Sequence, residues 1–301
     1  MPARVVLALV DEDNQFQQLL RADAEAAGRK VGIEVETVFT GESLAEHLGV
    51  LRRLVVAPDR RPDALVVMAV RDHGLDRVVR EVAGAGVHFV FLNAVEDDLD
   101  SIRREFPAVV VSTVCPDEVE TGRVQGQQLR ALVPAGRRVL YIQGSPRSLA
   151  SRQRTAGMQE ATAGAPFEVV LAGGDWSPAF AARTVREWLR FAVGGRRPFD
   201  LVACQNDHMA GGVLEALAAA AAEPGRPDVA RVPVAGCDGA PHIGQRMVRE
   251  GRLVATVVLP RVAGPAVEEI ARFLARGERP APVITHVATS FPPLPELHPI
   301  A

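Results

Sequence analysis

The sequence predicts an α/β protein built from two doubly wound lobes, each a parallel sheet with helices on both faces. Short runs of β-branched and other apolar residues alternate with amphipathic helix patterns along the chain. Such alternation is typical of parallel sheets that are covered on both faces. The 301-residue length is also sufficient for two domains of about 100–200 residues each.

Ten apolar runs are expected to form the strands, in two groups of five. The runs lie at 4–10, 31–39, 64–70, 87–93, 108–114, 138–144, 167–173, 201–206, 232–238 and 253–259. The clearest helix patterns lie at 16–27, 43–54, 75–84, 118–133, 148–163, 178–193, 207–221 and 240–250. Pro178 lies near a helix start, and Gly194, Gly251 and Gly277 follow helix patterns where a left-handed cap fits.

Composition excludes several classes of partner. The chain carries 34 basic and 37 acidic residues in mixed order, without the basic stripe that neutralises phosphates, so no nucleic acid is expected. The longest apolar stretches, such as 64–70, are far shorter than the roughly 20 residues that span a bilayer. Cys115, Cys204 and Cys237 show no CxxC spacing, which favours buried free thiols over a disulfide or a zinc site.

Polar residues follow several of the predicted strands. The run Gln205, Asn206, Asp207 and His208 separates an apolar strand from an alanine-rich helix pattern, and "CDGAPH" follows the strand at 232–238. In open parallel sheets, ligands bind outside the carboxyl ends of the strands. Two sheets whose strand ends face each other would place these groups around one inter-domain cleft, a usual place for a small-molecule site.

The segments "ACQNDHMAGGVLEAL" and "VPVAGCDGAPHIGQRMVREGRLVATVVLP" resemble the second domain of type I periplasmic binding proteins. The similarity is to the ribose-binding branch and its lactose-repressor-type relatives, and "EDNQF", "GSPRSLASRQRTAGM" and "GGDWSPAFA" resemble that family's sugar-contacting segments. The resemblance implies two lobes joined by three crossings that clamp a small ligand, commonly a monosaccharide. The first lobe is expected at 1–113 and 259–284, and the second at 114–258 and 285–301.

A sugar presents an apolar ring face and a rim of hydroxyls, so its site needs flat aromatic walls and planar polar groups. Phe16 and Trp176 resemble the family's stacking aromatics, although core packing is the alternative for each. Asp238 and Asn206 resemble its hydroxyl-binding carboxylate and amide, with helix capping as the alternative. Asp207 is the expected cap of the helix at 207–221, which would leave Asn206 free for the ligand.

Arg152 resembles the family's ligand-binding arginine, with Arg154 as a competing choice. Asn14, Asn93 and Asp117 are weaker matches at the corresponding strand ends. Arg71 and His73 are expected to be surface residues. Trp188 belongs to a stripe at four-residue spacing that is typical of a buried helix face, which leaves Trp176 as the expected reporter of ligand binding.

Two departures bear on the ligand. Ala94 stands where the ribose branch carries an arginine, and Val258 and Leu259 stand where many members have a glutamine. With two hydroxyl partners missing, the ligand is expected to be a less hydroxylated sugar, a sugar acid or a compound other than a sugar.

Three functions compete. The first is a solute-binding protein, a monomer that delivers its small-molecule ligand to an ABC permease; the second is a cytoplasmic sensor or repressor-like effector domain. Only Met1–Ala3 precede the first strand, so no helix-turn-helix is expected in this chain. The third, an enzyme, lacks a GxxxxGK[ST] loop, and its best candidate pair is Cys204 with His208. We expect a binding protein without catalytic residues, metal or cofactor, extracytoplasmic if a signal peptide was removed and otherwise cytoplasmic.

Overall fold

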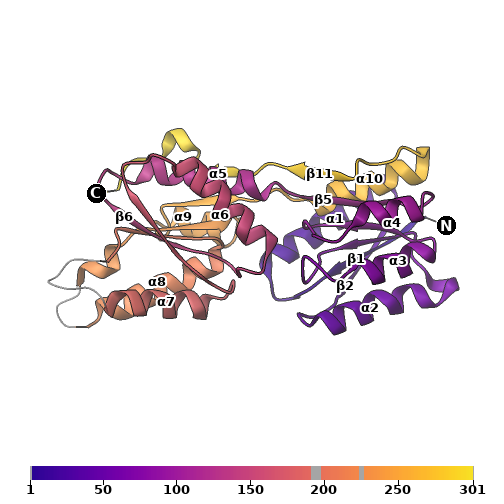
Figure 1. Cartoon of the computed structure of the whole chain (residues 1–301), viewed down its shortest axis with the longest axis horizontal. Helices are drawn as coiled ribbons and strands as arrows, with labels where there is room; N and C mark the ends of the chain where they lie inside the picture. The colour runs from indigo at the N-terminus through magenta and orange to yellow at the C-terminus, as the bar shows by residue number, and fades with distance from the viewer. Residues whose placement is uncertain (1, 191–197, 224–226, 301) are drawn as a thin grey trace. The chain divides into compact units, whose positions relative to one another are not determined.

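The computed structural model describes residues 2–190, 198–223 and 227–300 (Figure 1). The chain forms two compact units: Met1–Pro116 with Pro260–His286, and Asp117–Leu259 with Val287–Ala301. It passes between the units three times.

The first unit is built on a six-stranded sheet in the order β11-β5-β4-β3-β1-β2. All its strand pairs are parallel. Its strands are β1 (Arg4–Leu9), β2 (Glu34–Phe39), β3 (Ala64–Val67), β4 (His88–Phe91), β5 (Val111–Pro116) and β11 (Val283–His286). Its helices are α1 (Gln15–Val31), α2 (Leu44–Val56), α3 (Asp76–Gly84), α4 (Leu99–Glu105) and α10 (Ala263–Arg276), with a 3-10 turn at Pro58–Arg60.

The second unit repeats this plan in the order β12-β10-β9-β8-β6-β7, with β12 antiparallel to β10. Its strands are β6 (Arg138–Ile142), β7 (Glu168–Ala172), β8 (Leu201–Cys204), β9 (Val234–Asp238), β10 (Ala255–Val258) and β12 (Thr289–Phe291). Its helices are α5 (Glu118–Leu132), α6 (Leu149–Thr162), α7 (Pro178–Arg190), α8 (Asp207–Ala221) and α9 (Gly244–Arg249), with 3-10 turns at Pro227–Arg231 and Leu294–Glu296.

Each sheet has an apolar core on both faces, because successive strand side chains point to opposite sides. In β1, Leu7 packs toward α1 and α10, whereas Val6 packs toward α2, α3 and α4. In β6, Ile142 packs toward α7 and α8, and Tyr141 packs toward α5 and α6. The predicted fold class is confirmed.

All ten predicted strands are present, but the predicted total is too small. The residues that the structure describes form twelve strands, because β11 and β12 extend the two sheets at their edges. Pro178 begins α7, and Gly251 and Gly277 have φ of 71°, as a left-handed cap requires. Gly194 lies outside the described residues.

Two further predictions concern burial. All three cysteines are free and buried, as predicted. None of the helices in the described ranges combines the length and the apolar character that a bilayer crossing needs.

Candidate ligand site

Two residues at the carboxyl edge of the second sheet have backbone conformations that non-glycine residues rarely adopt. Asp238 ends β9 with φ of 100°, and Trp176, between β7 and α7, has φ of 72°. Among the residues the structure describes, no other non-glycine residue has a positive φ. A left-handed non-glycine residue costs of order 1–3 kcal/mol, and such strain clusters at ligand sites. These two residues are also ones that the sequence predicts as ligand contacts.

Arg154 holds the polar groups of this edge together from the buried face of α6. Its guanidinium binds both carboxylate oxygens of Glu118, with Nε–Oε2 at 2.6 Å and Nη2–Oε1 at 3.1 Å. Its Nη1 donates to the carbonyl oxygen of Gln205 at 2.7 Å and lies 3.6 Å from Asp238 Oδ1. Because Glu118 is buried as well, this bidentate pair is a fixed part of the second unit.

Glu118 can approach α6 because the two helices pack backbone to backbone. A Cβ at Gly122 would lie 2.0 Å from the Arg154 carbonyl oxygen, and one at Gly157 would lie 1.9 Å from the Val119 carbonyl oxygen. Both glycines are therefore needed for α5 and α6 to pack this closely.

The carboxyl group of Asp238 is only partly neutralised by this network. Burial raises the pKa of Asp238 to about 7, since desolvation outweighs the opposing attraction of Arg154. Glu118 raises it further. A ligand that donates hydrogen bonds to this carboxylate would favour its charged form.

Gln205 anchors the loop after β6. Its Oε1 accepts a hydrogen bond from the backbone N–H of Gly144 at 2.7 Å, and its Nε2 donates to the Ser151 carbonyl oxygen at 3.0 Å. The same nitrogen lies 3.2 Å from the hydroxyl oxygen of Tyr141. Gln205 is fully buried, so the first polar residue of the run 205–208 fixes loop geometry.

The structure corrects the predicted roles of Asn206 and Asp207. Asn206 is the cap of α8, because its Oδ1 accepts from the Met209 N–H at 2.7 Å. Its Nδ2 donates to the Trp176 carbonyl oxygen at 3.1 Å. The prediction had assigned the cap to Asp207 and left the Asn206 amide unengaged. It was wrong because α8 begins with Asp207 itself, which places Asn206 at the capping position.

Asp207 instead lies beneath the edge in a space lined by glycines. Its Oδ2 accepts from the Gly239 N–H at 2.8 Å, and its Oδ1 accepts from Thr256 Oγ1 at 2.7 Å. A Cβ at Gly236 or Gly244 would lie 2.2 or 2.0 Å from its carboxyl oxygens. Burial, and then the charge of Asp238, raise the pKa of Asp207 well above its ordinary value.

Trp176 is held from several sides. Its indole packs partly buried against the core of the second unit, and the Arg154 guanidinium carbon lies 5.5 Å from the ring centroid. Asp175 Oδ1 accepts from the Ser177 N–H at 2.9 Å and closes the turn around it. The indole is therefore a fixed feature of the edge.

The two remaining candidates of this unit differ in exposure. Arg152 is exposed near the start of α6, two residues before the buried Arg154. Asp117 caps α5, accepting from the Glu120 N–H at 2.9 Å. Of the two arginines, Arg154 is committed to the buried network, whereas Arg152 lies at the surface.

In the first unit, the predicted amides bind backbone groups. Asn14 caps α1 by accepting from the Gln17 N–H at 3.2 Å. Asn93 pairs with Ala69 twice, its Oδ1 accepting from the N–H at 2.8 Å and its Nδ2 donating to the carbonyl oxygen at 3.2 Å. Phe16 is half-buried and packs against the core of this unit.

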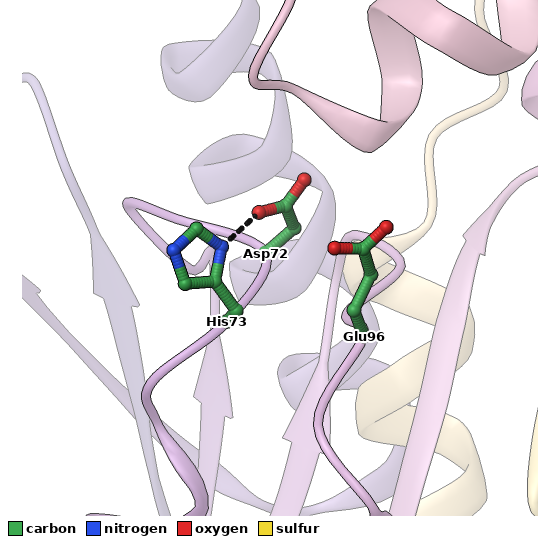
Figure 2. A group of neighbouring side chains, drawn as sticks. All are labelled: Asp72, His73 and Glu96. Carbon is green, nitrogen blue, oxygen red and sulfur yellow. Dashed lines mark hydrogen bonds and ion pairs between the residues drawn. The ribbon is translucent and has the colours of Figure 1, made fainter.

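Asp72, His73 and Glu96 gather in the loops that follow β3 and β4 (Figure 2). Asp72 Oδ1 and His73 Nδ1 are hydrogen-bonded at 2.7 Å, and the backbone N–H of Glu96 donates to the Asp72 carbonyl oxygen. One potential metal-ligating atom from each side chain lies within 4.8 Å of the others. His73 is exposed, as predicted, and the carboxylates beside it were not predicted.

The sequence interpretation missed Glu118 and the structural role of Gln205. A signal for Glu118 exists: Glu118, Thr121, Gln125 and Gln128 recur at helical spacing, and all are buried in α5. A polar stripe that follows a helix face toward the core indicates a buried network.

Comparison with known proteins agrees with this architecture. A two-lobed α/β fold with polar groups at its sheet edges is typical of a class of ligand-binding proteins. The family model described as a periplasmic binding protein domain matches residues 5–278. The chain belongs to this family.

Relatives and solved structures cover almost the whole chain. The ribose import binding protein RbsB of Salmonella typhimurium is 26% identical over 277 residues, covering 91% of this chain and 86% of that protein. The D-ribose/D-allose-binding protein of Pseudomonas aeruginosa is 26% identical over 264 residues, covering 84% and 76%. A solute-binding protein of an ABC transporter from Actinobacillus succinogenes, solved with D-allose, matches with a TM-score of 0.81 at 17% identity, covering 96% of each chain.

Proposed function

We propose that the protein clamps a sugar or sugar derivative between its two lobes and delivers it unchanged to an ABC permease. The observation that carries this proposal is the strain at Asp238 and Trp176. Left-handed conformations at both positions place a carboxylate and a flat indole at one sheet edge. That pair supplies what a sugar requires, an acceptor for its hydroxyls and an apolar wall for its ring.

The other candidates extend this pair. Arg152, at the surface of α6, would donate to ligand oxygens, while Arg154 would act indirectly by holding Asp238. In the first unit, Phe16 would supply a second apolar surface. Asn14, Asn93, Asp117 and Asn206 already bind backbone groups, so any contact they make with the ligand must use their remaining lone pairs or protons.

The ligand is expected to be a less hydroxylated sugar, a sugar acid or a related polar compound that is not a sugar. Ala94, Val258 and Leu259 cannot donate or accept hydrogen bonds through their side chains. Two of the relatives are named for ribose, or for ribose and allose, as their ligands. Pentoses, hexoses and their deoxy and acidic derivatives are therefore the first candidates.

A transport role favours an extracytoplasmic, monomeric protein. The relatives in the family are import and binding components, which favours this role over a repressor-like effector domain. Size-exclusion chromatography with light scattering tests the monomer, and cell fractionation of the native host tests the location.

A thermal-shift screen of sugars, sugar acids and polyols, followed by calorimetry, tests the proposal. A ligand at 100 times its dissociation constant should stabilise the protein by about 2.7 kcal/mol. Small-angle scattering should then show a smaller radius of gyration with ligand, because closure gains contacts from both lobes. If no sugar or sugar derivative binds, the proposed ligand class is wrong; if one binds without compaction, the clamp is wrong.

A further inference from the structure

The indole of Trp176 lies where a side chain at position 144 would be. A Cβ built on Gly144 would lie 2.2 Å from Trp176 Cε2, 2.3 Å from Cζ2 and 2.5 Å from Cδ2. Real Cβ atoms essentially never approach other heavy atoms this closely, so even alanine would force the ring to move.

The backbone of Gly144 does not itself require glycine. Its φ lies outside the left-handed region, in contrast to Gly136 and Gly164 elsewhere in the same unit. Its N–H donates to Gln205 Oε1, a bond that alanine can also make. The requirement for glycine therefore comes from the indole and not from the turn.

The position of Gly144 is fixed independently of Trp176. Gln205 holds it through the buried amide, and the preceding Gln143 N–H donates to the Ala172 carbonyl oxygen at 2.9 Å. The backbone of the Trp176 loop is equally close to the β6 loop, since a Cβ at Gly174 would lie 1.9 Å from the Gln143 carbonyl oxygen. With both loops fixed, a side chain at 144 would displace the indole more readily than the loops.

We propose that Gly144 is a positioning residue for ligand recognition: its missing side chain lets the indole of Trp176 lie flat on the β6 loop beside the Arg154 guanidinium. This inference rests on the proposed function for its effect on affinity, but its effect on the indole does not require a ligand. Enlarging residue 144 pushes the ring away from the edge, changing the surface against which a ligand ring would stack.

The test uses Gly144→Ala in a Trp188→Phe background, where Trp176 is the sole tryptophan. Without ligand, the variant should show red-shifted emission and stronger quenching by acrylamide, because the indole loses its contacts with the protein. Gly173→Ala is the matched control, because Gly173 lies in the loop that holds Trp176. A Cβ at Gly173 would meet nothing within 4 Å, and the φ of this residue is not left-handed. The control should leave both signals unchanged.

A mutant cycle with Trp176→Ala separates positioning from a general folding defect. If Gly144 acts through the indole, Gly144→Ala should lower the urea midpoint in the Trp176 background and have little effect once Trp176 is alanine. In the background that keeps Trp176, with D-ribose as the probe or the sugar that the screen identifies, Gly144→Ala should weaken binding about tenfold.

Two results would overturn the proposal. One is unchanged emission and quenching in Gly144→Ala without ligand; the other is an equal loss of stability whether or not Trp176 is present. Failure of every sugar to bind would instead count against the proposed function, because the ligand-free measurements would still report on the indole.

Discussion

The two units share one strand order but have differently built carboxyl edges. In the second unit, Arg154 joins Glu118, Gln205 and Asp238 into one buried network. The two main candidates for ligand contact, Asp238 and Trp176, have left-handed backbone conformations there. In the first unit, Asn93 binds one backbone segment, and the loops after β3 and β4 carry the buried Asp72 and the exposed Glu96. A preorganised surface loses less entropy on binding, so the second unit should contribute most of the ligand specificity.

The largest effect is expected from Arg154→Met. This change leaves Glu118 and Asp238 buried without their guanidinium partner, which should lower the free energy of unfolding by about 3–5 kcal/mol. Urea denaturation followed by circular dichroism measures it. Arg152→Met, in the same helix, is the control and should change stability by no more than about 0.5 kcal/mol while weakening ligand binding.

Equal stability losses in the two arginine variants would show that the buried network stabilises the second unit no more than an exposed arginine does. The same measurement would then remove the reason to assign Arg154 a structural role and Arg152 a ligand-binding one.

Asp238→Asn should reduce affinity more than any single change in the first unit. Asparagine tolerates the left-handed backbone but lacks the charge, so the loss should reach about 1–3 kcal/mol, or roughly 5- to 150-fold in the dissociation constant. Phe16→Ala in the first unit should have a smaller effect, at about 0.5–1.5 kcal/mol. Titration calorimetry with the identified sugar compares them, and a larger loss for Phe16→Ala would reverse the ranking of the two units.

One buried titratable group in each unit should make the stability of the protein depend on pH, with opposite signs in the two units. In the first unit, His47 is buried against Thr40, with Nδ1–Oγ1 at 2.7 Å, and its Nε2 has no hydrogen-bond partner among the described residues. Burial lowers the pKa of His47 to about 4, below its ordinary value of 6.5. The unfolded chain therefore binds a proton between pH 6.5 and 4 that the folded chain does not. The folded state therefore keeps its full stability above pH 6.5 with respect to His47 and loses stability as the pH falls. The free energy of unfolding should drop by about 1 kcal/mol from pH 7 to 5.5.

Asp238 has the opposite sign because its folded pKa is raised from 3.8 to about 7. Between these values the folded state keeps a proton that the unfolded state has released. The stabilisation is full below pH 3.8 and is lost as the pH rises toward 7.

Urea unfolding at pH 5 and pH 7.5 measures both contributions. His47→Gln should remove the loss at low pH, and Asp238→Asn should remove the loss at high pH. Identical pH profiles in both variants and the natural chain would show that neither burial matters for stability.

The sequence was sufficient for the fold because each strand is a short apolar run followed by a helix pattern. It missed β11 and β12, which hold four and three residues in a proline-rich tail, because they form by edge pairing and show little apolar periodicity. Edge pairing depends on which strand lies nearby, and a local pattern does not record that.

Prediction of the site stops at the level of individual roles. Asp238 and Trp176 could be selected as candidate ligand contacts because a polar residue at a strand end and an aromatic in a polar loop stand out from their surroundings. The predicted helix bounds, 207–221, are those of α8, but the residue that caps the helix is Asn206 and not Asp207. Propensity does not decide between the two neighbours, since both residue types are good caps. The pairing of Glu118 with Arg154 joins two helices 36 residues apart in sequence.

The smallest expected effect is spectroscopic and concerns the two tryptophans, both in the second unit. Trp188 packs half-buried against the apolar core from α7, beside the buried Val185 and Leu189, so its indole should not sense a ligand. Trp176 lies at the sheet edge beside Arg154, where a bound ligand would replace water on the ring and shift the emission.

Trp176→Phe should remove the shift and largely keep the affinity, because a flat wall survives, whereas Trp176→Ala should lose both. Trp188→Phe should keep the shift. If Trp188→Phe removes the shift instead, while Trp176→Ala binds normally, the ligand does not contact the 173–178 loop. The second unit would then lack its main aromatic contact with the ligand, which would weaken the case that it contributes most of the specificity.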